Sequence, residues 1–180
     1  MKIKQGMTLF FRENDAFSNW YLRDFTVKGI TFNCMEQYMM YSKAMLFGDK
    51  VTAQKILATT GPRCQQRQKN LGREVTPFNN AEWESKRERI VIAGLIAKFS
   101  QHKDLKELLL STVGTILVEA SPYDDIWGAK LGENDPRLFS LPPEQWPGKN
   151  LLGKCLTVAR DFLLRRDKQL EMGSSNGISP

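Results

Sequence analysis

Residues 35–47 read MEQYMMYSKAMLF, and no other stretch of the chain constrains the fold and the site as strongly. The composition is that of a helix, and Glu36 and Lys43 are its only side chains that ionise at neutral pH. Seven residues make about two turns, so both charges lie on one stripe of the helix. The same arc carries Met35, Met39, Met40, Leu46 and Phe47. The acid and the amine are therefore predicted to point into apolar surroundings, where a charge must be paired or have a chemical use.

This helix alone leaves two interpretations open. In the structural interpretation, Glu36 and Lys43 form a buried ion pair, or the helix is simply too apolar on all sides to have one inner face. Alternatively, the carboxylate and the amine share a pocket in which both pKa values are shifted, as in many active sites.

Working outward from this helix, the other expected elements are short or helical. Residues 8–11 and 115–119 read as strands, and FTVKGITF at 25–32 predicts a hairpin around Lys28-Gly29. Further helices are expected from the Asp49 cap to about Ala58, at 62–73, at 80–99 (the longest), at 103–110 and from about Asn150 to about Arg166, with a loop-rich stretch at 121–148. The sequence thus predicts one compact, mainly α-helical domain with a few short β-strands at 1–166, and a disordered tail at 167–180.

Composition narrows the class of protein. The 180 residues are enough for one domain with a core, and 41% hydrophobic and 26% charged residues are typical of globular proteins. No apolar stretch is long enough to span a membrane, and the first residues contain too short an apolar run for a secretory signal. Three widely spaced cysteines without a CxxC motif favour reduced thiols and a cytoplasmic location.

The charge and the motif content bear on ligands. A net charge of +6 favours an anionic ligand such as a phosphate, a nucleotide or nucleic acid. The single histidine, His102, lies in what reads as a polar helix junction. HExxH, Cys/His clusters, GxGxxG and GxxxxGK[ST] are all missing from the sequence, so neither a metal site nor a cofactor is expected.

Two segments before and after the long helix carry candidate site residues. In FSNWY (17–21), Ser18, Asn19 and Trp20 are suited to hydrogen-bond a sugar and stack on a base, unless the aromatic residues only cover the sheet. Glu119 ends the 115–119 strand, where a carboxylate binds hydroxyl groups at a pocket rim or simply marks the end of the strand at the surface.

Two further segments follow. In DDIWG (124–128), Trp127 is suited to wall a flat ligand and Asp125 to hold a hydroxyl or a water, although a plain turn has the same sequence. In WPGKN (146–150), Gly148, Lys149 and free N–H groups at a helix start favour an anion. The basic residues of the 62–73 helix more often form a solvated face than a phosphate contact; they are Arg63, Arg67, Lys69 and Arg73.

Six fragments occur in the order seen in the YbiA-like, or NADAR, family: FSNW, EQYMMYSKA, LGR, WESKRERIVIAGLIAKF, LVEASPYDDIWG and GKNLLGKCLTVAR. The chain resembles this family over about residues 8–162. The resemblance implies a compact, mostly helical domain that acts as an N-glycosidase on ribosyl–N bonds. Members hydrolyse phosphorylated ribosylamino-pyrimidine intermediates of riboflavin synthesis, or remove ADP-ribose from guanine in nucleic acid.

The resemblance also implies site residues. The family's acid-plus-lysine motif falls on Glu36 and Lys43, its strand-end acid on Glu119, and its WG motif on Trp127-Gly128, with Asp125 before it. Its GKN-x-LG motif falls on Gly148, Lys149, Asn150 and Gly153. Arg73 and Trp83 complete the substrate-binding candidates, Arg73 with Lys149 as a phosphate contact.

As a hypothesis, Lys43 attacks C1′ of the ribose, Glu36 is the neighbouring acid/base, and Glu119 and Asp125 hold ribose hydroxyls or the water. The sequence departs from the family at two places, and the second of them leaves the substrate open. Gln37 stands where many members have His, and the stretch between Trp127 and Trp146, expected beside the pocket, is longer. The alternative function is a non-catalytic module that binds ADP-ribose or a nucleotide.

Overall fold

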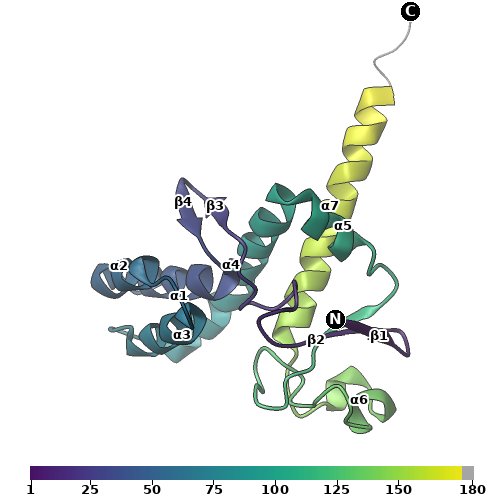
Figure 1. Cartoon of the computed structure of the whole chain (residues 1–180), viewed down its shortest axis with the longest axis horizontal. Helices are drawn as coiled ribbons and strands as arrows, with labels where there is room; N and C mark the ends of the chain where they lie inside the picture. Colours follow the sequence, from purple (N-terminus) through teal and green to yellow (C-terminus); the bar gives the residue numbers. More distant parts are fainter. Residues whose placement is uncertain (176–180) are drawn as a thin grey trace, which may run out of the picture.

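In the computed structural model, which describes residues 1–175, α-helices build most of the molecule (Figure 1). The helices are α1 (Met35–Leu46), α2 (Lys50–Ala58), α3 (Cys64–Glu74), α4 (Asn80–Gln101), α5 (Lys103–Leu110), α6 (Arg137–Ser140) and α7 (Leu151–Ser175), with a 3-10 turn at Pro143–Gln145. The strands are β1 (Lys2–Lys4), β2 (Met7–Phe10), β3 (Phe25–Val27), β4 (Ile30–Phe32) and β5 (Ile116–Glu119). The expected single domain, mainly α with a few short strands, is confirmed. No helix in this part of the chain is long and apolar enough to cross a membrane.

Helix α1 lies at the centre of the first half of the molecule. It packs against α2, α3 and α4, and α4 in turn packs along α7. Asp49 caps α2 by accepting from the Thr52 amide, as its sequence predicts, and Asn79 caps α4 in the same way through Glu82. Most of α1 is buried, since helices cover it on several sides.

The larger sheet has the order β1-β2-β5, with β1 antiparallel to β2 and β2 parallel to β5. Phe10 pairs with Glu119, so the carboxyl ends of β2 and β5 meet at one edge. The β3–β4 hairpin forms as expected around Lys28 and Gly29, whose positive φ values of 50° and 79° suit a tight two-residue turn. The sheet edge brings the segments after β2 and β5 together.

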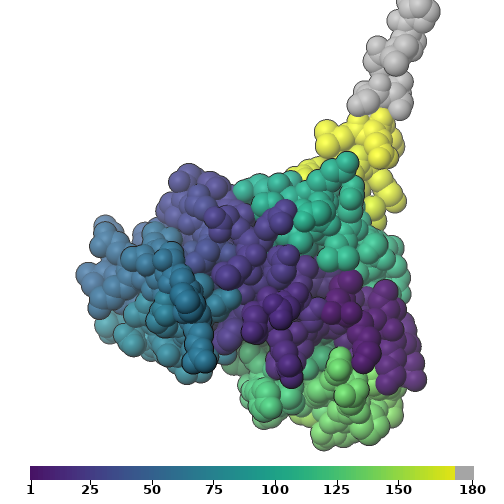
Figure 2. Space-filling view, in the orientation of Figure 1, coloured from purple at the N-terminus to yellow at the C-terminus, as the bar shows by residue number. Residues whose placement is uncertain are grey.

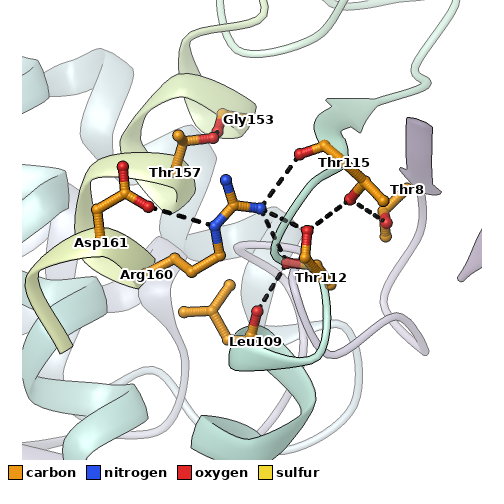
Figure 3. A network of polar contacts seen from close by, with 8 residues as sticks. All are labelled: Thr8, Leu109, Thr112, Thr115, Gly153, Thr157, Arg160 and Asp161. Atoms are coloured by element: carbon orange, nitrogen blue, oxygen red, sulfur yellow. Dashed lines mark hydrogen bonds and ion pairs between the residues drawn. The ribbon is translucent and has the colours of Figure 1, made fainter. Parts of the chain in front are cut away.

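A buried guanidinium ties α7 to this sheet (Figure 3). Arg160 donates to the carbonyl oxygens of Thr112 and Thr115 at 2.7 and 3.2 Å and to the Thr112 hydroxyl at 3.1 Å. Thr115 in turn bonds the Thr8 hydroxyl at 2.7 Å. Arg160 thus satisfies the polar groups of the turn before β5 and fixes that strand against β2 and α7.

Two expectations about the last helix are wrong. Helix α7 is longer than α4, and it continues past Arg166 to Ser175 (Figure 1). Residues 167–172 (DKQLEM) contain neither Gly nor Pro, and Lys106 of α5 holds Asp167 through an ion pair of 2.8 Å. Of the expected tail, residues 176–180 lie outside the described residues.

The loop-rich stretch 121–148 forms a second small core. Leu131, Leu138 and Trp146 pack against Leu9 and Val118 of the sheet. Figure 2 shows this green segment gathered under the purple N-terminal strands. The extra residues between Trp127 and Trp146 were expected beside the pocket. They do not line the cavity, because they pack against the face of the larger sheet that carries Leu9 and Val118.

Candidate active site

A cavity of about 680 Å³ lies among α1, α3, the loop at 11–20 and the segment after β5. Helix α1 contributes Glu36, Met39, Met40 and Lys43, and α3 contributes Gln66, Lys69, Gly72 and Arg73. The rest of the wall comes from Phe11, Arg12, Glu13, Ser18, Asn19, Trp20, Glu119, Ser121, Tyr123, Asp124, Asp125, Ile126, Trp127 and Leu152. This volume suits a ligand of nucleotide size.

Glu36 is buried in the first turn of α1, where its carboxylate faces the cavity. Burial raises the pKa of Glu36 to about 7, against the opposing effects of the Lys69 charge and of a hydrogen bond from Trp20. The Trp20 indole Nε1 donates to Glu36 Oε2 at 3.2 Å. Glu36 is therefore poised to exchange a proton near neutral pH.

Lys43 lines the same cavity two turns further along α1. Its Nζ donates to the Gly72 carbonyl oxygen at 2.6 Å and lies 4.2 Å from the centroid of the Phe78 ring. Burial lowers the pKa of Lys43. Among the described residues Lys43 makes no ion pair with Glu36, so the structural ion pair considered above is not formed.

Glu119 and Asp124 bring two more carboxylates to the cavity. Burial raises the pKa of Glu119 to about 8, and the Asp124 charge adds to the rise. Asp124 Oδ1 accepts from the amides of Ile126 and Trp127 at 2.9 and 2.7 Å, which fixes its carboxylate beside the two glutamates. Asp125, the acid preferred from the sequence, lies at the rim with a side chain 60% exposed and is 3.8 Å from Lys130 Nζ.

The loop at 18–20 supplies an aromatic wall and free polar atoms. Trp20 and Trp127 both line the cavity. The Ser18 hydroxyl accepts from the Trp20 amide at 3.1 Å. Asn19 is buried, and its Oδ1 has no hydrogen-bond partner among the described residues, so an acceptor is left for a ligand donor.

Helix α3 presents one cationic face to the cavity. Lys69 and Arg73 line it, and Lys69 Nζ is 5.9 Å from the Trp20 ring centroid. Arg67 instead donates to the carbonyl oxygens of Thr60 and Pro62. The basic residues of α3, expected to form a solvated face, therefore separate into two groups: Lys69 and Arg73 face the cavity, and Arg67 does not.

Several predicted residues hold the site from outside. Asn150 donates to the Leu117 carbonyl oxygen and accepts from the Glu119 amide, at 2.9 and 3.0 Å. Trp83 is buried and does not line the cavity; its ring centroid lies 5.9 Å from Lys43 Nζ. Gly128 packs against Gly148, where a Cβ would overlap the Gly128 carbonyl oxygen.

The expected anion site at the start of α7 is not formed. The amides of Lys149, Leu151 and Leu152 donate to the carbonyl oxygens of residues 125–127 at 2.9–3.1 Å, and the Asn150 amide bonds Gly128 at 3.0 Å. The Lys149 side chain is exposed and lies outside the cavity lining. The α7 start therefore fixes the 124–128 turn, and the amides of residues 149–152 are not available to a phosphate.

Sequence reasoning missed Asp124 and Lys69 as site residues. A signal for Asp124 was present, because Asp three residues before Trp127 fits a capped turn. Gln37 faces away from the cavity and bonds the Ile56 and Leu57 carbonyl oxygens at 3.0 and 3.1 Å. His102 bonds Arg23 and the Asp24 carbonyl oxygen. No trio of His, Cys, Asp or Glu side chains suited to a metal ion occurs within residues 1–175.

The fold and this cavity define a class: a helical, single-domain protein whose acid-rich and partly aromatic site suits a polar, ring-bearing ligand. Within that class the chain belongs to the NADAR family, since the NADAR domain model matches residues 9–164.

Its relatives include enzymes. It is 44% identical over 126 residues to an N-glycosidase of Acanthamoeba polyphaga mimivirus, covering 70% of this chain and 71% of that protein. It is 33% identical over 147 residues to N-glycosidase YbiA of Escherichia coli, covering 82% and 80%. The NMR structure of E. coli YbiA superposes with a TM-score of 0.72 at 28% identity, covering 92% of this chain and 89% of that one.

A third relative is the chloroplastic riboflavin biosynthesis protein PYRR of Arabidopsis thaliana. The chain is 49% identical to it over 84 residues, which are 46% of this chain and 12% of that protein. The two relatives named N-glycosidase support N-glycosidase activity for this chain.

Proposed function

We propose that this protein hydrolyses the C1′–N bond of a phosphorylated riboside. The substrate is a phosphorylated ribosylamino-pyrimidine of riboflavin synthesis or ADP-ribosylated guanine in nucleic acid. The observation that carries the proposal is the meeting of Glu36, Glu119 and the Lys43 amine in one partly aromatic cavity. The buried free cysteines favour a cytoplasmic setting.

Departure of the base is the step that needs acid. Breaking the C1′–N bond builds positive charge on C1′ and the ring oxygen, and the leaving nitrogen must take up a proton. Glu36, with a pKa of about 7, is suited to deliver that proton. The Asp124 carboxylate is fixed nearby and stabilises the developing cation electrostatically.

Lys43 is the proposed nucleophile. Its lowered pKa raises the share of neutral amine, whose lone pair attacks C1′ as the base leaves. Ring opening then moves a proton to the ring oxygen and leaves an imine between Nζ and C1′. Water adds to this imine, activated by a carboxylate, and the free sugar and the amine are released.

The remaining groups bind the substrate. Trp20 and Trp127 stack on flat rings, while Asn19 Oδ1 and Glu119 accept hydrogen bonds from ribose hydroxyls or place the water. Lys69 and Arg73 are the cations that face the cavity from α3, and we assign them the phosphate.

The test compares two substrates side by side by mass spectrometry: a phosphorylated ribosylamino-pyrimidine and an oligonucleotide with ADP-ribosylated guanine. Cleavage of one names the substrate. Cleavage of neither by a folded protein that binds ADP-ribose contradicts the enzyme proposal and favours the binding module.

The Lys43→Ala variant tests the mechanism. We expect it to fold and to lose turnover, because the nucleophile is gone while the cavity walls remain. Borohydride should trap a lysine–ribose adduct in the unaltered protein and none in the variant. Full activity of the variant would instead require direct attack by water.

A further inference from the structure

Lys98 of α4 is a buried cation that the proposed mechanism does not use. Its side chain is 0% exposed, and it lies outside the cavity lining. Within the described residues no carboxylate is within ion-pair distance of it, and the titratable or charged groups that face it are Cys34, Arg23 and the Tyr21 ring. An apolar side chain of similar shape would avoid the cost of desolvating the amine, so a role beyond packing is required.

The one hydrogen bond that Lys98 makes within residues 1–175 points to such a role. Lys98 Nζ donates to the Tyr21 carbonyl oxygen at 3.3 Å and lies 5.1 Å from the Tyr21 ring centroid. Tyr21 follows directly on Ser18, Asn19 and Trp20, which line the cavity. The Lys98 amine thus binds the backbone of the 18–21 loop from outside the cavity.

Three consecutive carbonyl groups of this loop are held by three different helices. The Asn19 oxygen accepts from the Glu36 amide of α1 at 2.8 Å, and the Trp20 oxygen accepts from Gln65 Nε2 of α3, also at 2.8 Å. Lys98 of α4 holds the third, on Tyr21. The segment lies outside helices and strands, so these bonds replace the regular ladder that would otherwise fix its backbone.

The residue so fixed is Trp20, whose indole donates to Glu36 Oε2. That hydrogen bond stabilises the ionised carboxylate and opposes the effect of burial on its pKa. A shift of the loop by a fraction of an ångström would lengthen a bond that is already 3.2 Å.

We propose that Lys98 and Gln65 are positioning residues that hold the Trp20 indole against Glu36. They act through the backbone of residues 20 and 21 and do not touch the substrate. The inference rests on the proposed function only in giving Glu36 its acid/base role.

The test follows the carboxyl carbon of Glu36 by ¹³C NMR during a pH titration of the ligand-free protein. In Lys98→Met, which keeps the length of the side chain and removes its donor, we expect the pKa of Glu36 to rise above its starting value of about 7. Trp20→Phe should raise it in the same way. The double variant Lys98→Met/Trp20→Phe should show no further rise in the Glu36 pKa, because both changes act through the same hydrogen bond from Trp20 to Glu36.

Two further variants complete the design. Gln65→Met removes the hydrogen bond to the Trp20 carbonyl oxygen and should also raise the Glu36 pKa. This variant replaces Lys98→Met in the test if Lys98→Met does not fold. Leu163→Ala is the control, since Leu163 is buried on α7, lies outside the cavity lining and should lower stability without moving that pKa.

An unchanged Glu36 pKa in Lys98→Met and Gln65→Met, or an equal rise in Leu163→Ala, overturns the proposal and leaves Lys98 a structural residue. The titration needs no substrate. A protein that cleaves neither candidate substrate therefore contradicts the proposed function without affecting this result.

Discussion

Asp124 and Asp125 are neighbours in the chain, but their carboxylates lie in different surroundings. Asp124 accepts hydrogen bonds from two backbone amides, and, in addition to burial, its charge raises the pKa of both buried glutamates. Asp125 is largely exposed beside Lys130. A sequence shows only that two acids precede Trp127. Which of them faces the cavity is decided by the turn, and the turn is decided by bonds to the start of α7.

These two residues give a matched pair of variants. We expect Asp124→Asn to lower kcat about 100-fold, because a fixed charge beside a developing cation contributes strongly to catalysis. Asp125→Asn should change it less than about fivefold, since an exposed ion pair contributes at most about 1 kcal/mol. Steady-state kinetics on the cleaved substrate, with circular dichroism as the control for folding, measures both. Equal losses would contradict the assignment of Asp124 to the site.

At the scale of elements, α7 and β5 approach each other more closely than two ordinary elements can. Gly153 lies inside α7, and a Cβ there would overlap the Leu117 carbonyl oxygen of β5 and press on the Asn150 amide. Backbone atoms of a strand cannot move aside as a flexible side chain can. This contact places Glu119, two residues after Leu117, at the cavity.

The close approach predicts an effect of opposite sign to the usual one. Alanine in place of a helical glycine normally stabilises a protein by about 1 kcal/mol. We expect Gly153→Ala to lower the free energy of unfolding by about 1–3 kcal/mol, because it overpacks the α7–β5 contact. Gly132→Ala, which adds its methyl group in open space, is the control. Urea unfolding measures both, and a Gly153→Ala protein as stable as the unaltered one would refute this packing.

How far an element could be predicted depends on how local its causes are. The α1 helix, the β3–β4 turn and the Asp49 cap follow from residues that lie close together in the chain, and all three are present. The parallel pairing of β2 with β5 joins residues more than 100 apart, and no local signal reveals it. The bonds of the amides of residues 149–152 could not be predicted for the same reason, because their acceptors come from another segment.

At the scale of the whole molecule, a chain of positive net charge has a cavity that several carboxyl side chains line. A charge of +6 attracts a phosphorylated ligand, while burial keeps two carboxyl groups of the cavity protonated well above their ordinary pKa. The same protonation links the site to stability. A carboxyl group whose pKa is raised by folding holds its proton in the folded state and loses it in the unfolded chain.

Stability should therefore fall as the pH rises from 5 to 7. In the unfolded chain Glu36 and Glu119 have pKa values near 4.5, against about 7 and about 8 when folded, so the folded protein binds more protons throughout this window. The expected loss is up to about 2 kcal/mol for each group. Above pH 8 the lowered pKa of Lys98, about 8, acts in the opposite direction, so the window ends below it. Urea unfolding at several pH values measures the slope, and Glu119→Gln should flatten it. A stability that rises between pH 5 and 7, or a slope that the variant leaves unchanged, would show that these carboxyl groups do not stay protonated in the folded site.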